Sequence, residues 1–242
     1  MATRPKSEAK SPPTDTRGKI VDALMELAAE RRFEDISVRD ISKAAGVSLA
    51  DFRDAFASKG AVLAGFTRHI DRIVLAQDDG ELSEENSRER LFDVLMRRLE
   101  AMAPYREGLR EVAAWLRRQP AAALAMNQVT MSSMRFMLEA AGIEAAGTSG
   151  AIKLQGLALA WARVLQVWLD DEDPALSKTM AELDRVLTRG ERAVAGLDRV
   201  SAITSPVTAF VQAAFDAGRR ARRGGNRSAR KDDPGDEDVT AL

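Results

Sequence analysis

The chain has 242 residues, a formal net charge of −1 and no cysteine. This length can bury a substantial core, and the lack of cysteine excludes disulfides, thiolate metal sites and cysteine nucleophiles. A near-neutral charge gives no global electrostatic argument for nucleic acid binding, so any such site must be local.

The N-terminal segment 1–15 is polar, contains proline and lacks the apolar core of a secretory signal. We expect it to be a disordered arm. No stretch of the chain approaches the roughly 18 uninterrupted apolar residues of a membrane-spanning helix. We therefore expect a soluble, cytoplasmic protein.

Alanine and leucine are abundant and β-branched runs are short, which favours helices throughout. A first amphipathic helix is predicted over 16–31, where apolar residues recur at three- and four-residue spacing. These residues are Ile20, Leu24, Leu27 and Ala28.

Two short helices are predicted next, each opened by a serine with an acidic residue three positions later. Ser37 and Asp40 open a helix over 38–45, and Ser48 and Asp51 repeat the spacing after Gly46. In such a capping box the hydroxyl and the carboxylate bond free backbone N–H groups of the first turn. Glycine takes the left-handed turn between them without strain. Together these signals predict a helix-turn-helix.

A linking helix is predicted over 58–77, and an acidic, polar loop follows it. Further helices are expected at 87–103, 106–118, 121–141, 148–171 and 174–195, the last opened by Asp173 as cap and Pro174 in its first turn. The expected parts are an arm (1–15), a helix-turn-helix domain with its linking helix (16–77), a helical ligand-binding and dimerisation domain (78–196), and a tail (197–242). The tail includes a candidate amphipathic helix over 205–223 and a disordered, charged end.

Four segments in the first third of the chain form a connected series. They are Ile-Val-Asp-Ala-Leu at 20–24, Phe-Glu-Asp-Ile-Ser-Val-Arg-Asp-Ile at 33–41, Ala-Ala-Gly-Val-Ser at 44–48 and Phe-Ala-Ser-Lys at 56–59. This series resembles the TetR family of bacterial transcription regulators. The resemblance implies an all-α fold, with a three-helix helix-turn-helix domain and a C-terminal bundle of about six helices. It also implies a homodimer that binds a double-stranded DNA operator and responds to a small molecule in the body.

The resemblance further implies a set of DNA-binding residues at the ends and on the face of the short helices. Serine, arginine and lysine at helix starts suit phosphate oxygens, whereas Arg53 could donate to guanine and Asp51 could accept from cytosine. The set is Ser37, Arg39, Ser48, Leu49, Ala50, Asp51, Arg53 and Lys59.

The sequence departs from the family pattern in the second short helix. Arg53 and Ala55 stand where the family usually has tyrosine and histidine, and Asp51 and Asp54 add negative charge. A helix-turn-helix that serves only as a packing unit is therefore an alternative.

A second, local resemblance lies at 167–174, 179–181 and 183–187. These segments are similar to the C-terminal signature of a lipid-binding family that assists ubiquinone biosynthesis, which shares the fold and implies a lipid-presenting protein without a cofactor. Asp170, Asp171 and Asp173 also have a plain interpretation as solvent-facing residues and a helix cap. Similarly, 205–223 suits either an anionic membrane surface or packing on the body.

No catalytic constellation and no cofactor motif is found, and His69 is a lone imidazole, so we expect neither an enzyme nor a metal site. Methionine-rich positions of several helices could line an apolar pocket for a small hydrophobic ligand or lipid, or form plain core. They are Met96, Leu99, Met102, Leu116, Met131, Met134, Met137 and Trp161. The dimer interface is predicted at Leu154, Leu157, Val164, Leu165 and Trp168.

The function predicted from these patterns is a ligand-responsive TetR-type repressor. The alternatives are a lipid-binding accessory protein of ubiquinone biosynthesis with the same fold and a helical interaction protein that binds neither DNA nor lipid.

Overall fold

A computed structural model describes residues 13–77 and 86–193. Within those ranges all regular secondary structure is helical, which confirms the all-α prediction. The predicted arm (1–12 of it), the loop at 78–85 and the tail from 194, with its candidate helix at 205–223, lie outside the described residues.

The first three helices form the predicted helix-turn-helix. They are α1 (Pro13–Glu30), α2 (Val38–Ala44) and α3 (Leu49–Ala55), with a short 3-10 turn η1 (Phe33–Asp35) between α1 and α2. Both predicted capping boxes are present, and Gly46 has a φ of 65° in the turn between α2 and α3. The local signals of the sequence therefore start both short helices where they were expected.

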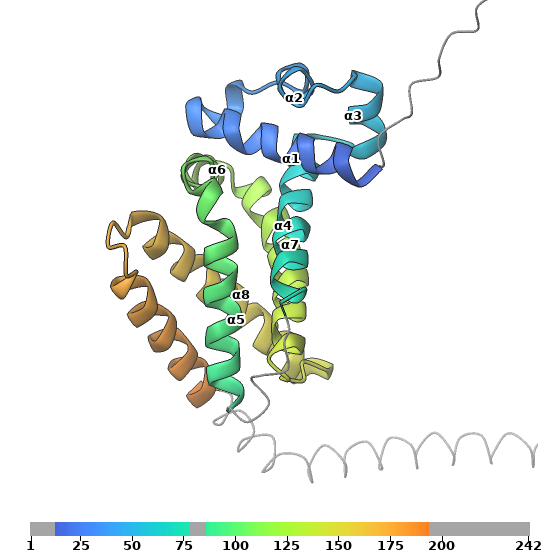
Figure 1. Ribbon diagram of the computed structural model, residues 1–242. Helices are drawn as coiled ribbons and strands as arrows, with labels where there is room; N and C mark the ends of the chain where they lie inside the picture. The colour runs from blue at the N-terminus through green and yellow to red at the C-terminus, as the bar shows by residue number, and fades with distance from the viewer. Residues whose placement is uncertain (1–12, 78–85, 194–242) are drawn as a thin grey trace, which may run out of the picture. The chain divides into compact units, whose positions relative to one another are not determined.

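The remaining helices agree with the predicted ranges to within a few residues at each end. They are α4 (Lys59–Leu75), α5 (Ser87–Met102), α6 (Arg106–Arg118), α7 (Pro120–Ala140) and α8 (Gly147–Asp170), with a 3-10 turn η3 (Ala103–Tyr105) before α6. Figure 1 shows α1, α2 and α3 at one end of this part of the chain, with α4 running from them into the body beside α7. One hydrophobic core joins α1–α8, so packing does not separate the helix-turn-helix from the body.

The predicted start of the last body helix is wrong by three residues. Pro174 lies in a turn, and the helix runs over 177–193, to the end of the described residues. Asp173 acts as a cap in this turn, since its carboxylate accepts from the backbone N–H groups of Ala175 (3.0 Å) and Ser177 (3.3 Å). Asp171 caps the same corner through Thr179, so two of the aspartates behave as the plain interpretation expected.

The helix-turn-helix is fixed to the body by a close crossing of α1 and α6. A β-carbon at Gly108 of α6 would lie only 2.4 Å from the backbone oxygen of Met25 in α1, so the two backbones touch at a position that only glycine permits. Beside the crossing, the Tyr105 hydroxyl donates to Asp22 at 2.9 Å. Burial and then this bond raise the pKa of Tyr105 to about 12.

We predict that Gly108→Ala destabilises the protein, because the added methyl group pushes α6 off α1. Overpacking of this kind typically costs about 1–3 kcal/mol of unfolding free energy. Gly190→Ala is the matched control, since Gly190 is helical and exposed with nothing within 4 Å of an added β-carbon. The control should gain about 0.5–1 kcal/mol from its helix propensity. Urea unfolding of both variants checks this, and equal stability of the two would contradict the close crossing.

We also predict an acid-sensitive stabilisation at Asp171. Its carboxylate accepts from the Thr179 hydroxyl at 2.7 Å and from the Thr179 backbone N–H at 2.9 Å, and these bonds keep the pKa of Asp171 below its usual value. A carboxyl group with a lowered folded-state pKa stabilises the fold above its unfolded pKa of about 3.9, and that stabilisation is lost as the pH falls through the folded value.

Asp171→Asn should therefore be less stable than the native chain at pH 7, and the difference should shrink below about pH 4. Denaturant midpoints at pH 7 and pH 3 measure the two differences. A difference that does not depend on pH would argue against an ionised cap.

Candidate functional site

The second helix of the helix-turn-helix presents a small outward face. Phe52 is buried on the inner side of α3, whereas Leu49, Ala50 and Arg53 are exposed. The Phe52 and Phe56 rings pack with centroids 6.4 Å apart, which fixes α3 on the inner core. The outward face is therefore held by packing beneath it and is open to a partner.

The two predicted serines have a local structural role. Ser37 accepts from the Asp40 backbone N–H at 3.1 Å and donates to its carboxylate at 2.7 Å, which keeps the pKa of Asp40 below its usual value. Ser48 and Asp51 repeat this pattern, with a hydroxyl-to-carboxylate distance of 2.7 Å. The Asp51 carboxylate is thus engaged in starting α3, so its predicted contact with cytosine would compete with the cap.

Lys59 is turned into the protein. Its ammonium donates to the backbone oxygens of Phe33 and Ile36, the latter at 2.7 Å, and lies 4.4 Å from the centre of the Phe33 ring. This burial lowers the pKa of Lys59. Since an ammonium has three donors, at most one is left for the predicted phosphate contact. The main role of Lys59 in the structure is to join α4 to η1.

The charges on the outward face are mixed. Arg53 is exposed and makes only a long contact, at 3.4 Å, with the Ala57 backbone oxygen, and Arg39 is exposed at the start of α2. Asp54 is exposed beside Arg53. Such a surface can offer guanidinium donors to phosphates or base edges, but it lacks the uniform positive charge of a non-specific nucleic acid binder.

A second attachment of the helix-turn-helix to the body was not predicted. The backbone N–H of Phe33 in η1 donates to Glu111 of α6 at 3.0 Å, and the Phe33 ring packs on Trp115 with centroids 4.5 Å apart. Arg118 then bridges Glu34 (3.3 Å) and Glu111 (3.7 Å). Body and helix-turn-helix are therefore joined through α6 as well as through α4.

The residues predicted to line a ligand pocket are mostly core. Leu99, Met102, Met134, Met137 and Trp161 are buried, and the other three, Met96, Leu116 and Met131, are partly buried against the same core. The plain interpretation, methionines at helical spacing as core, describes their packing in this structure.

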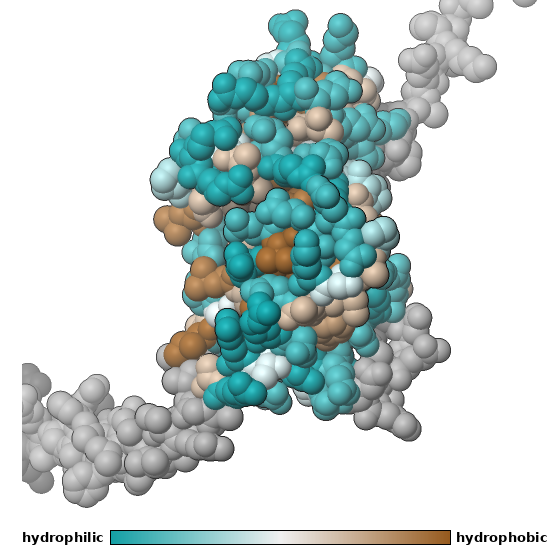
Figure 2. All heavy atoms as spheres, turned by 90° about the vertical axis from the view of Figure 1, so that its left-hand side faces the viewer, coloured by the Kyte–Doolittle hydropathy of each residue, from teal (hydrophilic) through white to brown (hydrophobic). Residues whose placement is uncertain are grey.

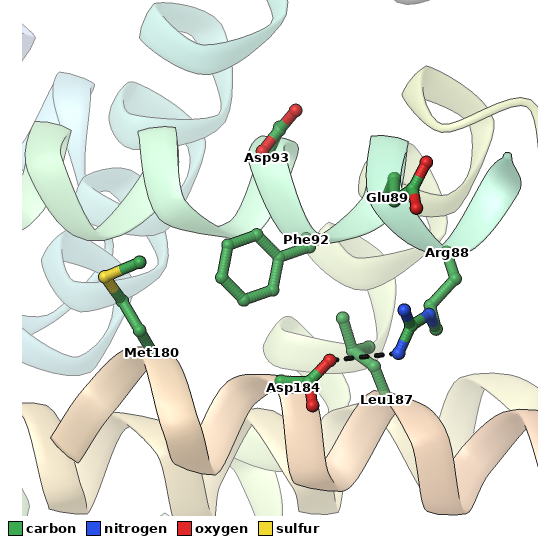
Figure 3. A pocket seen from close by; sticks show the side chains of 7 residues that line it. All are labelled: Arg88, Glu89, Phe92, Asp93, Met180, Asp184 and Leu187. Carbon is green, nitrogen blue, oxygen red and sulfur yellow. Dashed lines mark hydrogen bonds and ion pairs between the residues drawn. The ribbon is translucent and has the colours of Figure 1, made fainter. Parts of the chain in front are cut away.

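A hollow of about 450 Å³ lies elsewhere, between α5 and the 177–193 helix. Figure 3 shows Phe92, Met180 and Leu187 pointing into the space between the two helices, while Arg88 reaches across to Asp184 at 2.9 Å. None of the eight predicted pocket residues lines it. Figure 2 looks onto the side of the molecule that carries the 177–193 helix and shows an apolar patch between hydrophilic side chains.

The predicted dimer interface is wrong for most of its residues. Leu154, Leu157, Val164 and Trp168 are at most 8% exposed in a single chain, so they pack on the protomer's own core, and Leu165 is only partly buried. The apolar stripe of α8 that suggested an interface is the stripe that faces inward. Its outward face instead carries Ile152 and Leu159, which are 52% and 61% exposed, with the exposed Gly156 between them.

Metal ligands do not gather anywhere in residues 13–77 and 86–193, where no group of three or more histidine or acidic side chains is placed to hold an ion. In the same residues no helix is both long and apolar enough to cross a membrane.

Comparison with known proteins gives structural matches alone. No family model matches the chain, and no curated protein matches its sequence. A TetR transcriptional regulator from Nitrosomonas europaea matches with a TM-score of 0.58 and 22% identity, over 72% of this chain and 97% of that one. A TetR transcriptional regulator from Rhodococcus matches with a TM-score of 0.53 and 19% identity, over 73% and 96% of the two chains.

A third match, to a TetR-family regulator from Streptomyces coelicolor, has a TM-score of 0.51 and 16% identity and covers 90% of this chain and 99% of the other. Identities at this level compare folds and carry no residue roles across. Together with the helix order, the capping boxes and the exposed α3, they establish that this chain has the TetR fold.

Proposed function

We propose that the protein is a TetR-type transcriptional regulator that binds a double-stranded DNA operator through α3. The observation that carries this proposal is the outward face of α3, where Leu49, Ala50 and Arg53 are exposed on a helix fixed from beneath by Phe52. An α-helix fits the major groove of B-DNA, and arginine makes the commonest specific contact there, with guanine.

In this proposal the exposed residues divide into two groups. Arg53 reads a base, and Leu49 and Ala50 contact thymine methyl groups or exclude other bases. Ser37, Arg39 and Ser48 lie at the N-terminal ends of α2 and α3, where phosphates are favoured. Lys59 contributes by holding η1 and α4 together rather than as a principal phosphate ligand.

We further propose a cytoplasmic homodimer that acts as a ligand-responsive repressor and has no catalytic activity. A symmetric dimer places two copies of α3 on one operator, and half-sites one DNA turn apart match that symmetry. The outward face of α8, with Ile152, Gly156 and Leu159, supports a dimer contact there. The solved structures similar to this chain are regulators, and they do not favour the lipid-binding alternative.

The first prediction concerns DNA binding. Duplexes selected from a random library by the purified protein should contain a palindrome, and binding should weaken steeply between 50 and 200 mM salt, as is usual for phosphate contacts. Arg53→Ala should weaken binding about 5- to 150-fold, which corresponds to about 1–3 kcal/mol for one arginine–guanine contact. Fluorescence anisotropy measures both effects.

Arg189→Ala is the matched control, because Arg189 is an exposed arginine on the 177–193 helix, far along the chain from α3. It should bind the selected duplex as the native chain does. If no duplex is enriched, or if both arginine variants behave alike, α3 is not a DNA-reading helix.

The second prediction concerns the dimer. Leu159→Arg should weaken self-association by at least about tenfold, since a two-fold interface places the new charge at the contact twice. Leu124→Arg is the control, because Leu124 is 65% exposed on α7 and lies outside the proposed interface. Sedimentation equilibrium of the three proteins measures the association constant. A monomeric native chain, or dimers unaffected by Leu159→Arg, would refute this interface.

A further inference from the structure

A charged cluster is buried where α4, α5 and α7 meet. The Arg98 guanidinium of α5 forms an ion pair with Asp71 of α4, and the Ser133 hydroxyl of α7 donates to the same carboxylate oxygen at 2.6 Å. The Arg98 side chain is 4% exposed and the Asp71 side chain 12%. Such a pair contributes little to stability compared with apolar residues of the same volume, because both charges lose their hydration.

The arginine of this pair is incompletely used. Only Nη1 of Arg98 has acceptors, namely Asp71 and, at 3.9 Å, the sulfur of Met137. Its Nε is buried and has no hydrogen-bond partner among the described residues. A buried donor left without an acceptor carries the full cost of its lost hydration. The edge of the guanidinium that can bind a carboxylate in a two-pronged manner is therefore available.

The surroundings of Arg98 are apolar and adaptable. The Trp161 ring of α8 lies 5.4 Å from its guanidinium carbon. Met134 and Met137, on the same helix as Ser133, are fully buried. Methionine side chains are flexible and polarisable, so a core that contains them can rearrange around an inserted group at low cost.

We propose that Arg98 is the recognition point for a small apolar molecule with a single carboxylate, which enters among α5, α7 and α8 and replaces Asp71 as the partner of the arginine. One carboxylate for another leaves the buried charge unchanged, and the ligand gains the Nε edge that Asp71 does not use. A phosphate dianion would add an uncompensated charge in the interior, which is costly. A neutral or cationic ligand would leave Nε without an acceptor.

The exchange would act on the helix that carries the helix-turn-helix. Asp71 is on α4, and it is more exposed than Arg98, so the displaced carboxylate can turn towards solvent while Arg98 stays bound to the ligand. The link between α4 and α5 at this level would then be broken. This consequence for DNA rests on the function proposed above, whereas ligand binding itself does not.

The test measures binding without DNA. Two carboxylates, decanoate and 2-naphthoate, are compared with their neutral counterparts, decanol and 2-naphthol, by the shift in melting temperature and by titration of tryptophan fluorescence. The tryptophan signal is suitable because Trp161 faces Arg98. At least one carboxylate should bind saturably to the native chain, and its neutral counterpart should bind at least about tenfold more weakly, the ratio expected for losing one charge-assisted hydrogen bond.

Three variants separate this proposal from a purely structural ion pair. Asp71→Asn removes the internal competitor, so it should bind the carboxylate more tightly than the native chain, and the ligand should raise its melting temperature by a larger amount. Asp71→Asn combined with Arg98→Met removes both charges, which keeps the fold accessible, and should lose the preference for carboxylate. Arg97→Met is the matched control on the same helix; Arg97 bonds the Gln77 backbone oxygen and should be dispensable for binding.

The proposal is overturned if neither carboxylate binds, if acid and neutral counterpart bind equally, if Asp71→Asn does not bind the acid more tightly, or if the double variant keeps the preference. A carboxylate that binds as expected but leaves the affinity for a selected duplex unchanged would confirm the site and refute only its coupling to DNA. Failure to find any duplex would instead count against the DNA-binding proposal alone.

Discussion

The close crossing of α1 and α6 is the constraint on which the placement of the helix-turn-helix depends. Two helix backbones meet at Gly108 with no room for a β-carbon, and this contact brings η1 within reach of Glu111 and Trp115. The helix-turn-helix is therefore held by α6 as well as by the covalent link through α4. Any change in the body that moves α4 alone must strain or break the α6 contacts, so the two attachments have to move together.

The features that could be predicted from the sequence are those that depend on neighbours within a few residues. The Ser37 and Ser48 capping boxes and the turn at Gly46 satisfy their own backbone groups, so a pattern of four residues is sufficient to place them. The corner after α8 shows the limit of such signals. Asp173 is a cap, as its position suggested, but Leu176 adopts a φ of 52° and delays the helix start to residue 177.

The features that could not be predicted depend on contacts between distant residues. Periodicity identifies the apolar face of α8 but not whether that face covers its own core or a second chain, and for Leu154 and Trp168 it covers the core. Lys59 similarly resembles an exposed phosphate ligand until η1 folds against it. One signal was available but unused: Asp71 and Arg98 are residues of opposite charge that each interrupt an apolar stripe, and such residues on two helices are candidates for a buried pair.

The self-contained start of α3 has a consequence for the thermodynamics of recognition. Its first turn is stabilised by Ser48 and Asp51, and its inner side rests on Phe56, so the helix is ordered before any partner arrives. Segments that fold on binding lose conformational entropy at that moment and show a large negative change in heat capacity. A partner that meets α3 encounters a finished surface, so the heat capacity change should reflect only the area that the two surfaces bury.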